Sequence, residues 1–277
     1  MRIDAHQHFW LYNAQEYGWI SDSMSVLRRD FRPADLRKEI AAVGIDGVIS
    51  VQARQTLDET GWLLDWAANF DFIKGVVGWV PLISETVRRD LDRFGDRPKF
   101  KAVRHVLQDE ADDNYMLRED FNRGIRTLKN TGLRYDILIY ERHLPQTIQF
   151  VDMHPQQVFI LDHVAKPRIR DNALTPWKSN LRELAKRRNV FCKISGMVTE
   201  ADHRTWTPQQ LRPFLDAALE AFGSRRLMFG SDWPVCLLAS SYRRWHQIVN
   251  EFAAQLTPDE QDRLFGGTAT EAYGLDD

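Results

Sequence analysis

The chain has 277 residues, of which 43% are hydrophobic, and this length suits one domain, which we expect to span residues 1–277. The formal net charge is −2 and no basic stripe is present, so nucleic acid is not an expected partner. The sequence contains no signal-peptide-like start, no apolar stretch that would cross a membrane and only two cysteines, so we expect a cytoplasmic protein.

Short apolar, β-branched runs alternate with amphipathic segments along the chain, a pattern typical of βαβ units and a parallel sheet. The predicted strands are residues 2–6, 47–52, 73–80, 102–106, 134–140, 158–162, 190–194 and 227–230. This repeated alternation predicts closure into a (β/α)8 TIM-like barrel. A doubly wound open sheet remains the alternative, although no glycine-rich phosphate loop follows the first strand.

The segments between these strands are predicted to be helices, because apolar residues return every three or four positions. Several of them end at a glycine, which is a common helix stop, and Ser84 is predicted to cap one of them. The predicted apolar faces are Leu36, Ile40 and Val43 before Gly44; Val87, Leu91 and Phe94 before Gly95; Phe121, Ile125 and Leu128 before Gly132; and Phe214, Leu215, Ala218 and Phe222 before Gly223.

The first predicted strand ends in His6-Gln7-His8. Catalytic groups of a barrel come from the C-terminal ends of its strands. Residues i and i+2 of a strand point to the same face, so the two imidazoles can converge, as a metal site or a polar catalytic pocket requires. Taken alone, the pair is explained equally well by two structural histidines whose hydrogen bonds are satisfied.

Two further polar residues follow later strands. His163 comes after the sixth predicted strand, and Asp232 comes after the eighth, in a sharp turn between Gly230 and Pro234. A carboxylate beside several imidazoles suits the activation of water, because it accepts the proton while cations or a metal hold the developing oxyanion. The alternative for Asp232 is a helix N-cap.

Arg104 lies in the fourth predicted strand and is a further catalytic candidate, because a fixed guanidinium can polarise a carbonyl or hold a carboxylate. Lys193, in the seventh strand, is either a packing residue or a donor to the pocket. The polar residues 140–143 after the fifth strand are expected to form salt bridges at the barrel rim.

Aromatic and amide side chains near the strand ends are candidate substrate contacts. Gln52 and Trp79 follow the second and third strands and can bind a polyol-sized ligand through hydrogen bonding and stacking, although core packing is favoured for Trp79. We add His105 and Trp233, which neighbour the catalytic candidates, and the undecided Lys193 to this set of substrate-binding candidates.

Five segments together are similar to a known family. They are residues 4–10 (DAHQHFW), 103–105 (VRH), 162–167 (DHVAKP), 193–196 (KISG) and 230–234 (GSDWP). In this order, and across nearly the whole chain, they resemble the amidohydrolase superfamily, and specifically its branch of sugar-lactone hydrolases, which includes L-fuconolactonases and L-rhamnono-lactonases. The resemblance implies a TIM-like barrel that hydrolyses an aldonolactone in sugar catabolism.

The resemblance also bears on the cofactor. Superfamily members with two metals carry a lysine or glutamate bridge and two further histidines at strand ends, whereas here only His163 is clearly placed, so a binuclear centre is not expected. One divalent ion, Zn²⁺, can bind to His6, His8 and Asp232, either alone or together with His163. Hydrolysis without metal is the alternative, since related lactonases of this superfamily are said to work that way.

The expected reaction begins when Asp232 deprotonates a water molecule that attacks the lactone carbonyl. The three histidines and Arg104 stabilise the oxyanion, and Asp232 then returns the proton to the ring oxygen. Two alternatives remain open: a metal-dependent decarboxylase of an aromatic acid, an activity that occurs on similar barrels, and a sugar-acid binding protein without catalysis. Analogy between folds does not choose among them.

Overall fold

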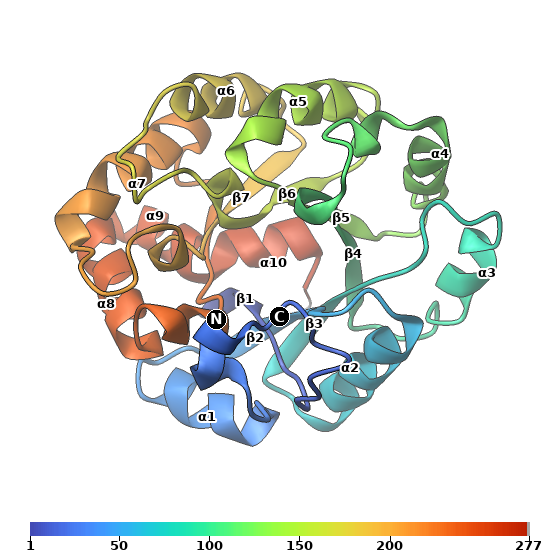
Figure 1. The fold of residues 1–277 in the computed structure, drawn as a ribbon, viewed down its shortest axis with the longest axis horizontal. Helices are drawn as coiled ribbons and strands as arrows, with labels where there is room; N and C mark the ends of the chain where they lie inside the picture. The colour runs from blue at the N-terminus through green and yellow to red at the C-terminus, as the bar shows by residue number, and fades with distance from the viewer. Residues whose placement is uncertain (276–277) are drawn as a thin grey trace.

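The computed structural model describes residues 1–275, so the last two residues of the predicted 1–277 domain lie outside the described range. Within that range, eight parallel strands run in the order β1 to β8, and helices form a ring around them (Figure 1). The strands are β1 (Ile3–Gln7), β2 (Gly47–Val51), β3 (Ile73–Gly78), β4 (Phe100–Val106), β5 (Arg134–Leu138), β6 (Phe159–Leu161), β7 (Val190–Ile194) and β8 (Leu227–Phe229). The predicted (β/α)8 barrel is confirmed.

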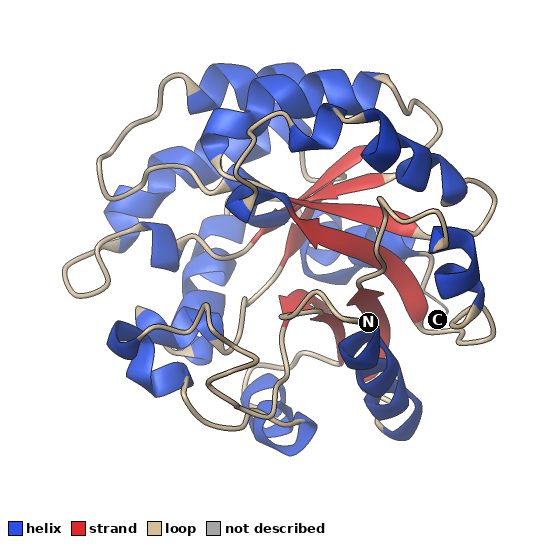
Figure 2. Cartoon of the chain, turned by 45° about the vertical axis from the view of Figure 1, so that its right-hand side comes forward, coloured by secondary structure: helices blue, strands red, loops and turns tan. Residues whose placement is uncertain are grey.

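All helices except α10 surround the strands, which fan out in Figure 2 with helices above and below them. The helices are α1 (Pro33–Ala41), α2 (Leu57–Asn69), α3 (Val87–Asp92), α4 (Glu119–Thr127), α5 (Leu144–Asp152), α6 (Trp177–Leu184), α7 (Pro208–Phe222), α8 (Tyr242–Ala253), α9 (Pro258–Asp262) and α10 (Thr268–Tyr273). Among residues 1–275, no helix combines the length and apolar character that a bilayer crossing demands.

Two hydrogen bonds join the last strand segment to the first and complete the barrel. The backbone N–H of Asp232 donates to the carbonyl of His6 over 2.8 Å, and that of His8 donates to the carbonyl of Trp233 over 2.7 Å. Both bonds lie just beyond the last residue of β8. The junction between β1 and the segment after β8, which we call the seam of the barrel, therefore contains His6, His8 and Asp232, the residues predicted to form the site.

The predicted strands all exist, with ends that differ by at most two residues. The largest differences are at the carboxyl ends of β3 and β5, which stop at Gly78 and Leu138, and at the amino end of β4, which starts at Phe100. Helix α3 also differs from expectation, because Thr86 and not Ser84 precedes it. Ser84 instead lies in a turn, in which its backbone N–H donates to the carbonyl of Pro81 and its hydroxyl accepts from the N–H of Thr86.

Helix α10 closes the end of the barrel opposite the site and crosses the middle of the ring in Figure 1. Ala269, Ala272 and Tyr273 are buried against inward-facing strand residues such as Ile49. At the starts of the strands, Arg134 donates through Nε to the carbonyl of Ala272 over 2.7 Å. The amino end of the barrel is thus filled by apolar packing against α10, and the polar side chains of the site lie toward the carboxyl end.

Candidate active site

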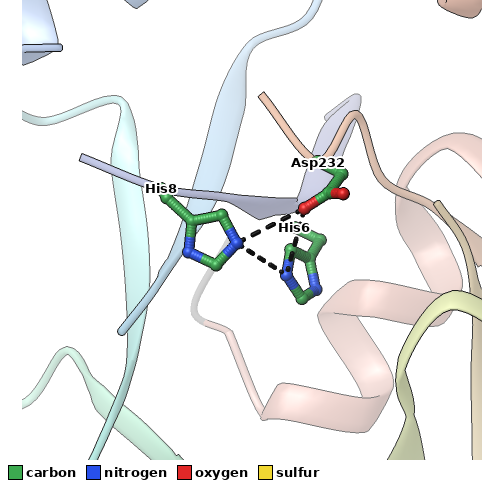
Figure 3. A group of neighbouring side chains, drawn as sticks. All are labelled: His6, His8 and Asp232. Carbon is green, nitrogen blue, oxygen red and sulfur yellow. Dashed lines mark hydrogen bonds and ion pairs between the residues drawn. The ribbon is translucent and has the colours of Figure 1, made fainter. Parts of the chain in front are cut away.

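Three predicted residues converge at the carboxyl end of the barrel (Figure 3). The Nε2 atoms of His6 and His8 lie 3.2 Å apart. Oδ1 of Asp232 lies 3.3 Å from Nε2 of His8 and 3.8 Å from Nε2 of His6. All three side chains are buried. The structure therefore brings together residues that are more than two hundred positions apart in the sequence.

The local sequence explains why these side chains point at one another. Asp232 has φ of 56°, so the turn after β8 is left-handed there and aims the carboxylate back over the barrel. A Cβ on Gly230 would lie 2.8 Å from Cβ of His6, so only glycine allows this approach. Asp4 fixes both sides of the seam, because its Oδ1 accepts from the backbone N–H groups of His6 and Ser231. In this conformation Asp232 does not cap a helix, and Pro234 occupies the N-cap of the short helix that follows.

The hydrogen bonds of His6, in β1, and of His8, just after it, suit a metal ligand or a proton acceptor. Nδ1 of His8 lies 2.8 Å from the carbonyl oxygen of Val51. A carbonyl only accepts, so Nδ1 carries a proton and Nε2 is the ring nitrogen that faces the cluster. Nδ1 of His6 lies 3.3 Å from Asp162 and 3.2 Å from Nζ of Lys193, which holds the ring at a fixed angle.

The spacing of the three converging atoms fits a tetrahedral metal ion. Ligands at roughly 2.0–2.1 Å from zinc stand about 3.4 Å from one another. The three separations here, 3.2, 3.3 and 3.8 Å, bracket that value. A second set, formed by His6, Asp162 and His163, also brings ligand atoms close together. Asp162 is already engaged by Arg104 and Lys193, so the His6, His8 and Asp232 set is the better candidate.

His163 joins the cluster from the end of β6. Its Nε2 lies 3.9 Å from Oδ1 of Asp232, and its Nδ1 lies 2.8 Å from the hydroxyl of Ser195. Burial lowers the pKa of His163 to about 4, so the ring is neutral at pH 7. Burial alone would raise the pKa of Asp232, but His163, His8 and His6 outweigh it and hold that pKa below its usual range. The Asp232 carboxylate is therefore ionised at neutral pH.

Replacing Gly196 with alanine is expected to lower activity by displacing His163. Gly196 has φ of 62°, and a Cβ there would lie 2.5 Å from Nδ1 of His163. Alanine in a left-handed conformation also costs about 1–2 kcal/mol of stability. Thermal unfolding and kcat measured on the same preparation check this expectation.

Gly223→Ala is the matched control for that substitution. Gly223 also has a positive φ, 66°, but a Cβ there would meet no atom within 4 Å, so both variants place alanine where φ is positive and only Gly196→Ala adds a clash. We expect both variants to lose stability and Gly196→Ala alone to lose activity. Equal activities in the two variants would show that the position of His163 does not limit catalysis.

A buried ionic layer lies beneath the cluster. Nζ of Lys193 lies 2.5 Å from Asp136 and 2.9 Å from Asp162, and Arg104 donates to Asp162 over 2.9 Å. The hydroxyl of Tyr273, from α10, donates to Asp136 over 2.7 Å. Lys193 is wholly buried in this layer, so the structure answers the question left by the sequence: it supports the site from below and is not a donor exposed in the pocket.

The charges of this layer depend on one another. Burial raises the pKa of Asp136 to about 6, and Lys193 limits the rise. Burial would also raise the pKa of Asp162, but Lys193, His6 and Arg104 hold it well below its usual range. Removing one partner would leave another charge buried without compensation.

A cleft of about 860 Å³ opens above the cluster. Of the predicted residues, His8, His163, Asp232, Arg104 and Gln52 line it. Arg104 is held in place because its Nη2 donates to the side-chain oxygen of Gln52 over 2.8 Å. Four of the five catalytic candidates and one predicted substrate contact therefore share a cavity large enough for a small sugar derivative, whereas the fully buried His6 does not line it.

Like Lys193, three other predicted substrate contacts do not line this cleft, and we do not retain them. Nε1 of Trp79 lies 3.4 Å from Nδ1 of His105, and Nε2 of His105 lies 2.6 Å from Glu110. Successive strand residues face opposite sides, so with Arg104 pointing inward, His105 points outward. Trp233 likewise turns away from Asp232 and packs against the ring of Phe31 at a centroid distance of 5.2 Å.

The cleft contains residues that the sequence patterns did not single out as site residues. Trp19, Lys166 and Glu200 line it, and so does Tyr140, which we expected to lie in a rim salt-bridge group. Its neighbours do form rim ion pairs. These join Glu141 to Arg168 over 2.8 Å, Arg142 to Asp113 over 3.2 Å and His143 to Asp113 over 2.8 Å.

A buried carboxylate shapes one wall of the cleft. Glu59 of α2 accepts from the backbone N–H groups of Ala53 and Arg54 over 3.0 and 2.6 Å, and the segment after β2 that contains them lines the cavity. Burial raises the pKa of Glu59 from 4.5 to about 7, and the bonds from Arg54 and Ala53 limit the rise. The carboxyl group of Glu59 therefore titrates closer to neutral pH than that of an exposed glutamate.

Glu59→Gln is expected to flatten the dependence of stability on pH. Because the folded-state pKa is raised, Glu59 stabilises the fold fully below pH 4.5, and this contribution is lost as the pH rises through about 7. Denaturant unfolding of wild type and variant from pH 4 to 8 measures the difference. An identical pH dependence in the two proteins would contradict the assigned role of burial.

Comparison with known proteins places the chain in a family. The sequence profile described as Amidohydrolase matches residues 3–275. The chain belongs to the amidohydrolase family. Two relatives of this amidohydrolase are named L-fucono-1,5-lactonase: one from Burkholderia multivorans is 42% identical, and one from Burkholderia ambifaria is 37% identical. In each comparison the alignment covers 99% of this chain and 96% of the relative.

Solved structures agree with the barrel. Crystal structures of an amidohydrolase from Burkholderia multivorans, one with bound HEPES and one with bound zinc, match with a TM-score of 0.97 at 42% identity, and both chains are covered completely. A 2,6-dihydroxybenzoate decarboxylase from Rhizobium matches with a TM-score of 0.71 at 14% identity. At that identity the second likeness shows the fold alone.

Proposed function

We propose that this amidohydrolase hydrolyses a sugar lactone of the L-fuconolactone type to the corresponding aldonic acid. One observation carries the proposal: the ionised carboxylate of Asp232 lies beside His6, His8 and His163 at the base of a cleft of about 860 Å³. The two Burkholderia relatives named L-fucono-1,5-lactonase support the choice of substrate.

In the proposed reaction Asp232 acts first as a base. Its carboxylate accepts a proton from a water molecule, whose oxygen attacks the lactone carbonyl and forms a tetrahedral oxyanion. Arg104, whose Nη1 lies 3.5 Å from Nε2 of His6, provides a fixed positive charge near this oxyanion. The bond from the carbonyl carbon to the ring oxygen then breaks, and Asp232 returns its proton to that oxygen. The product is the open-chain aldonic acid, in which the former ring oxygen is a hydroxyl group.

His6, His8 and Asp232 are the residues that we propose to hold one divalent ion, and Zn²⁺ is the ion whose geometry they fit. Such an ion would supply Lewis acidity toward a carbonyl oxygen. The zinc bound to the Burkholderia multivorans amidohydrolase supports this choice of metal. We also propose a cytoplasmic location, which the two buried free thiols of Cys192 and Cys236 support.

A screen of aldonolactones by acid release, run with and without a chelator, tests the function. We expect hydrolysis of L-fucono-1,5-lactone well above its spontaneous rate, and a loss of this activity with chelator that Zn²⁺ restores. Full activity after chelation, with no metal detected in the protein, would support the metal-independent alternative. Release of carbon dioxide from aromatic acids without lactone turnover would favour the decarboxylase, and binding without turnover would favour a sugar-acid binding protein.

A further inference from the structure

The turn after β6 has an unusual backbone. His163, Val164, Ala165 and Lys166 have φ values of 54°, 48°, 62° and 46°, so four consecutive residues other than glycine are left-handed. Such residues are strained, and a β-branched valine is especially disfavoured there. Strain of this kind persists only where the surroundings hold it, and it collects at functional sites.

Packing and hydrogen bonds hold this turn in place. Val164 and Ala165 are fully buried, and Nε1 of Trp177 donates to the carbonyl of Val164 over 2.7 Å. The turn directs two side chains upward. His163 reaches the catalytic cluster, and Lys166 lines the cleft next to it. The first of these has a role in the proposed mechanism, whereas the mechanism leaves the second unused.

Glu200 faces Lys166 from the segment after β7. It ends the short helix η6 (Val198–Glu200), and its carbonyl accepts from the backbone N–H of Arg170, which ties the two loops together. Nζ of Lys166 lies 4.0 Å from Oε1 of Glu200 and 5.5 Å from the ring centre of Tyr140. The pair is thus too loose for a direct hydrogen bond, which leaves ammonium donors and carboxylate acceptors available in the cleft.

We propose that Lys166 and Glu200 bind the ring hydroxyls of the substrate and set the preference for polyhydroxylated lactones. Neighbouring hydroxyls both accept and donate, so one can accept from Nζ of Lys166 while the next donates to Glu200. A lactone without hydroxyls would leave this half-buried pair without partners when it displaced water from the cleft. The inference rests on the proposed lactone hydrolysis and concerns which lactones are accepted.

Two lactones with the same ring size test the proposal. L-fucono-1,5-lactone carries hydroxyls on its six-membered ring, whereas δ-valerolactone carries none. In Lys166→Met and in Glu200→Gln we expect kcat/KM for the sugar lactone to fall about 10- to 100-fold, mainly through KM, because each variant removes hydrogen bonds to a charged group. We expect kcat/KM for δ-valerolactone to stay within about threefold of wild type, and Lys166→Arg to retain part of the preference.

The chain provides a matched control pair outside the cleft. Lys186 and Glu183 form an exposed ion pair of 2.6 Å at the end of α6, so Lys186→Met and Glu183→Gln make the same chemical changes away from the site. Both control variants are expected to hydrolyse the two lactones as wild type does. Their behaviour separates a general effect of charge from an effect inside the cleft.

Each possible outcome decides the matter. Equal losses on both lactones would overturn the proposal, because Lys166 and Glu200 would then serve the chemistry or the fold. Unchanged preference in both variants would also overturn it. If wild type hydrolyses neither lactone, the proposed function fails separately, and calorimetric titration with L-fuconate still tests the subsite. Binding that is weakened in the two cleft variants supports it, and equal or absent binding overturns it.

Discussion

Asp232→Asn is expected to lower kcat for lactone hydrolysis by about 10²- to 10⁴-fold while leaving the barrel folded. Asparagine has nearly the same shape but cannot accept the proton of the attacking water. The three histidines around the carboxylate would lose an anionic partner, and their rings are held independently by Val51, Asp162 and Ser195. Steady-state kinetics and thermal unfolding on one preparation measure both parts of the expectation.

The metal content of the Asp232→Asn variant separates two roles of this carboxylate. If activity falls while bound zinc is unchanged, Asp232 acts as the base. If zinc and activity fall together and added zinc restores both, its main role is as a ligand. Asp216→Asn is the surface control, because Asp216 is half-exposed on α7 and pairs with Arg212. Wild-type turnover by Asp232→Asn would contradict the mechanism.

Lys193→Met is expected to destabilise the protein by about 3–5 kcal/mol, the largest loss of stability among the changes considered. Methionine fills a similar volume but leaves Asp136 with Tyr273 as its remaining hydrogen-bond partner and takes one of two cations from Asp162. It also removes the ammonium next to His6. Denaturant unfolding gives the change in free energy, and residual activity reports whether His6 is still positioned.

Two further variants test whether the loss of stability in Lys193→Met comes from the uncompensated charge of Asp136. Asp136→Asn added to Lys193→Met removes the uncompensated anion and is expected to recover part of the lost stability. Tyr273→Phe removes one hydrogen bond to the same carboxylate and is expected to cost only about 1–3 kcal/mol. If Lys193→Met unfolds at the same denaturant concentration as wild type, the ionic layer does not contribute to stability in the way described.

The catalytic cluster was predictable from the sequence because barrel geometry makes strand ends informative. His6 and His8 obey the two-residue period of a strand, and the later strands bring His163 and Asp232 to the same end. The same period shows why Arg104 and His105 cannot both face the cleft. This alternation could be read from the sequence, so the prediction of His105 as a substrate contact was inconsistent with that of Arg104.

Other parts of the site could not be read from local patterns. The left-handed turn that directs Lys166 into the cleft runs through Val164, a residue whose intrinsic preference is opposed to that conformation. Trp19 lies on a loop and Glu200 ends the short helix η6, and neither segment is long enough for a periodic pattern to fix the direction of the side chain. The role of Lys193 depends on Asp136 and Tyr273, which lie far away in the sequence. The residues of its own strand therefore could not show whether Lys193 packs inside the barrel or donates to the pocket.

The plug formed by α10 has a consequence for how the protein is made. Tyr273 enters the barrel from below and bonds to Asp136, one of the anions that neutralise Lys193. A nascent chain can pair its earlier strands during synthesis, but this floor lacks a member until the ribosome has released the segment around residue 273. Catalytic competence should therefore arise only after α10 has left the ribosome, and chains truncated before α10 would remain inactive.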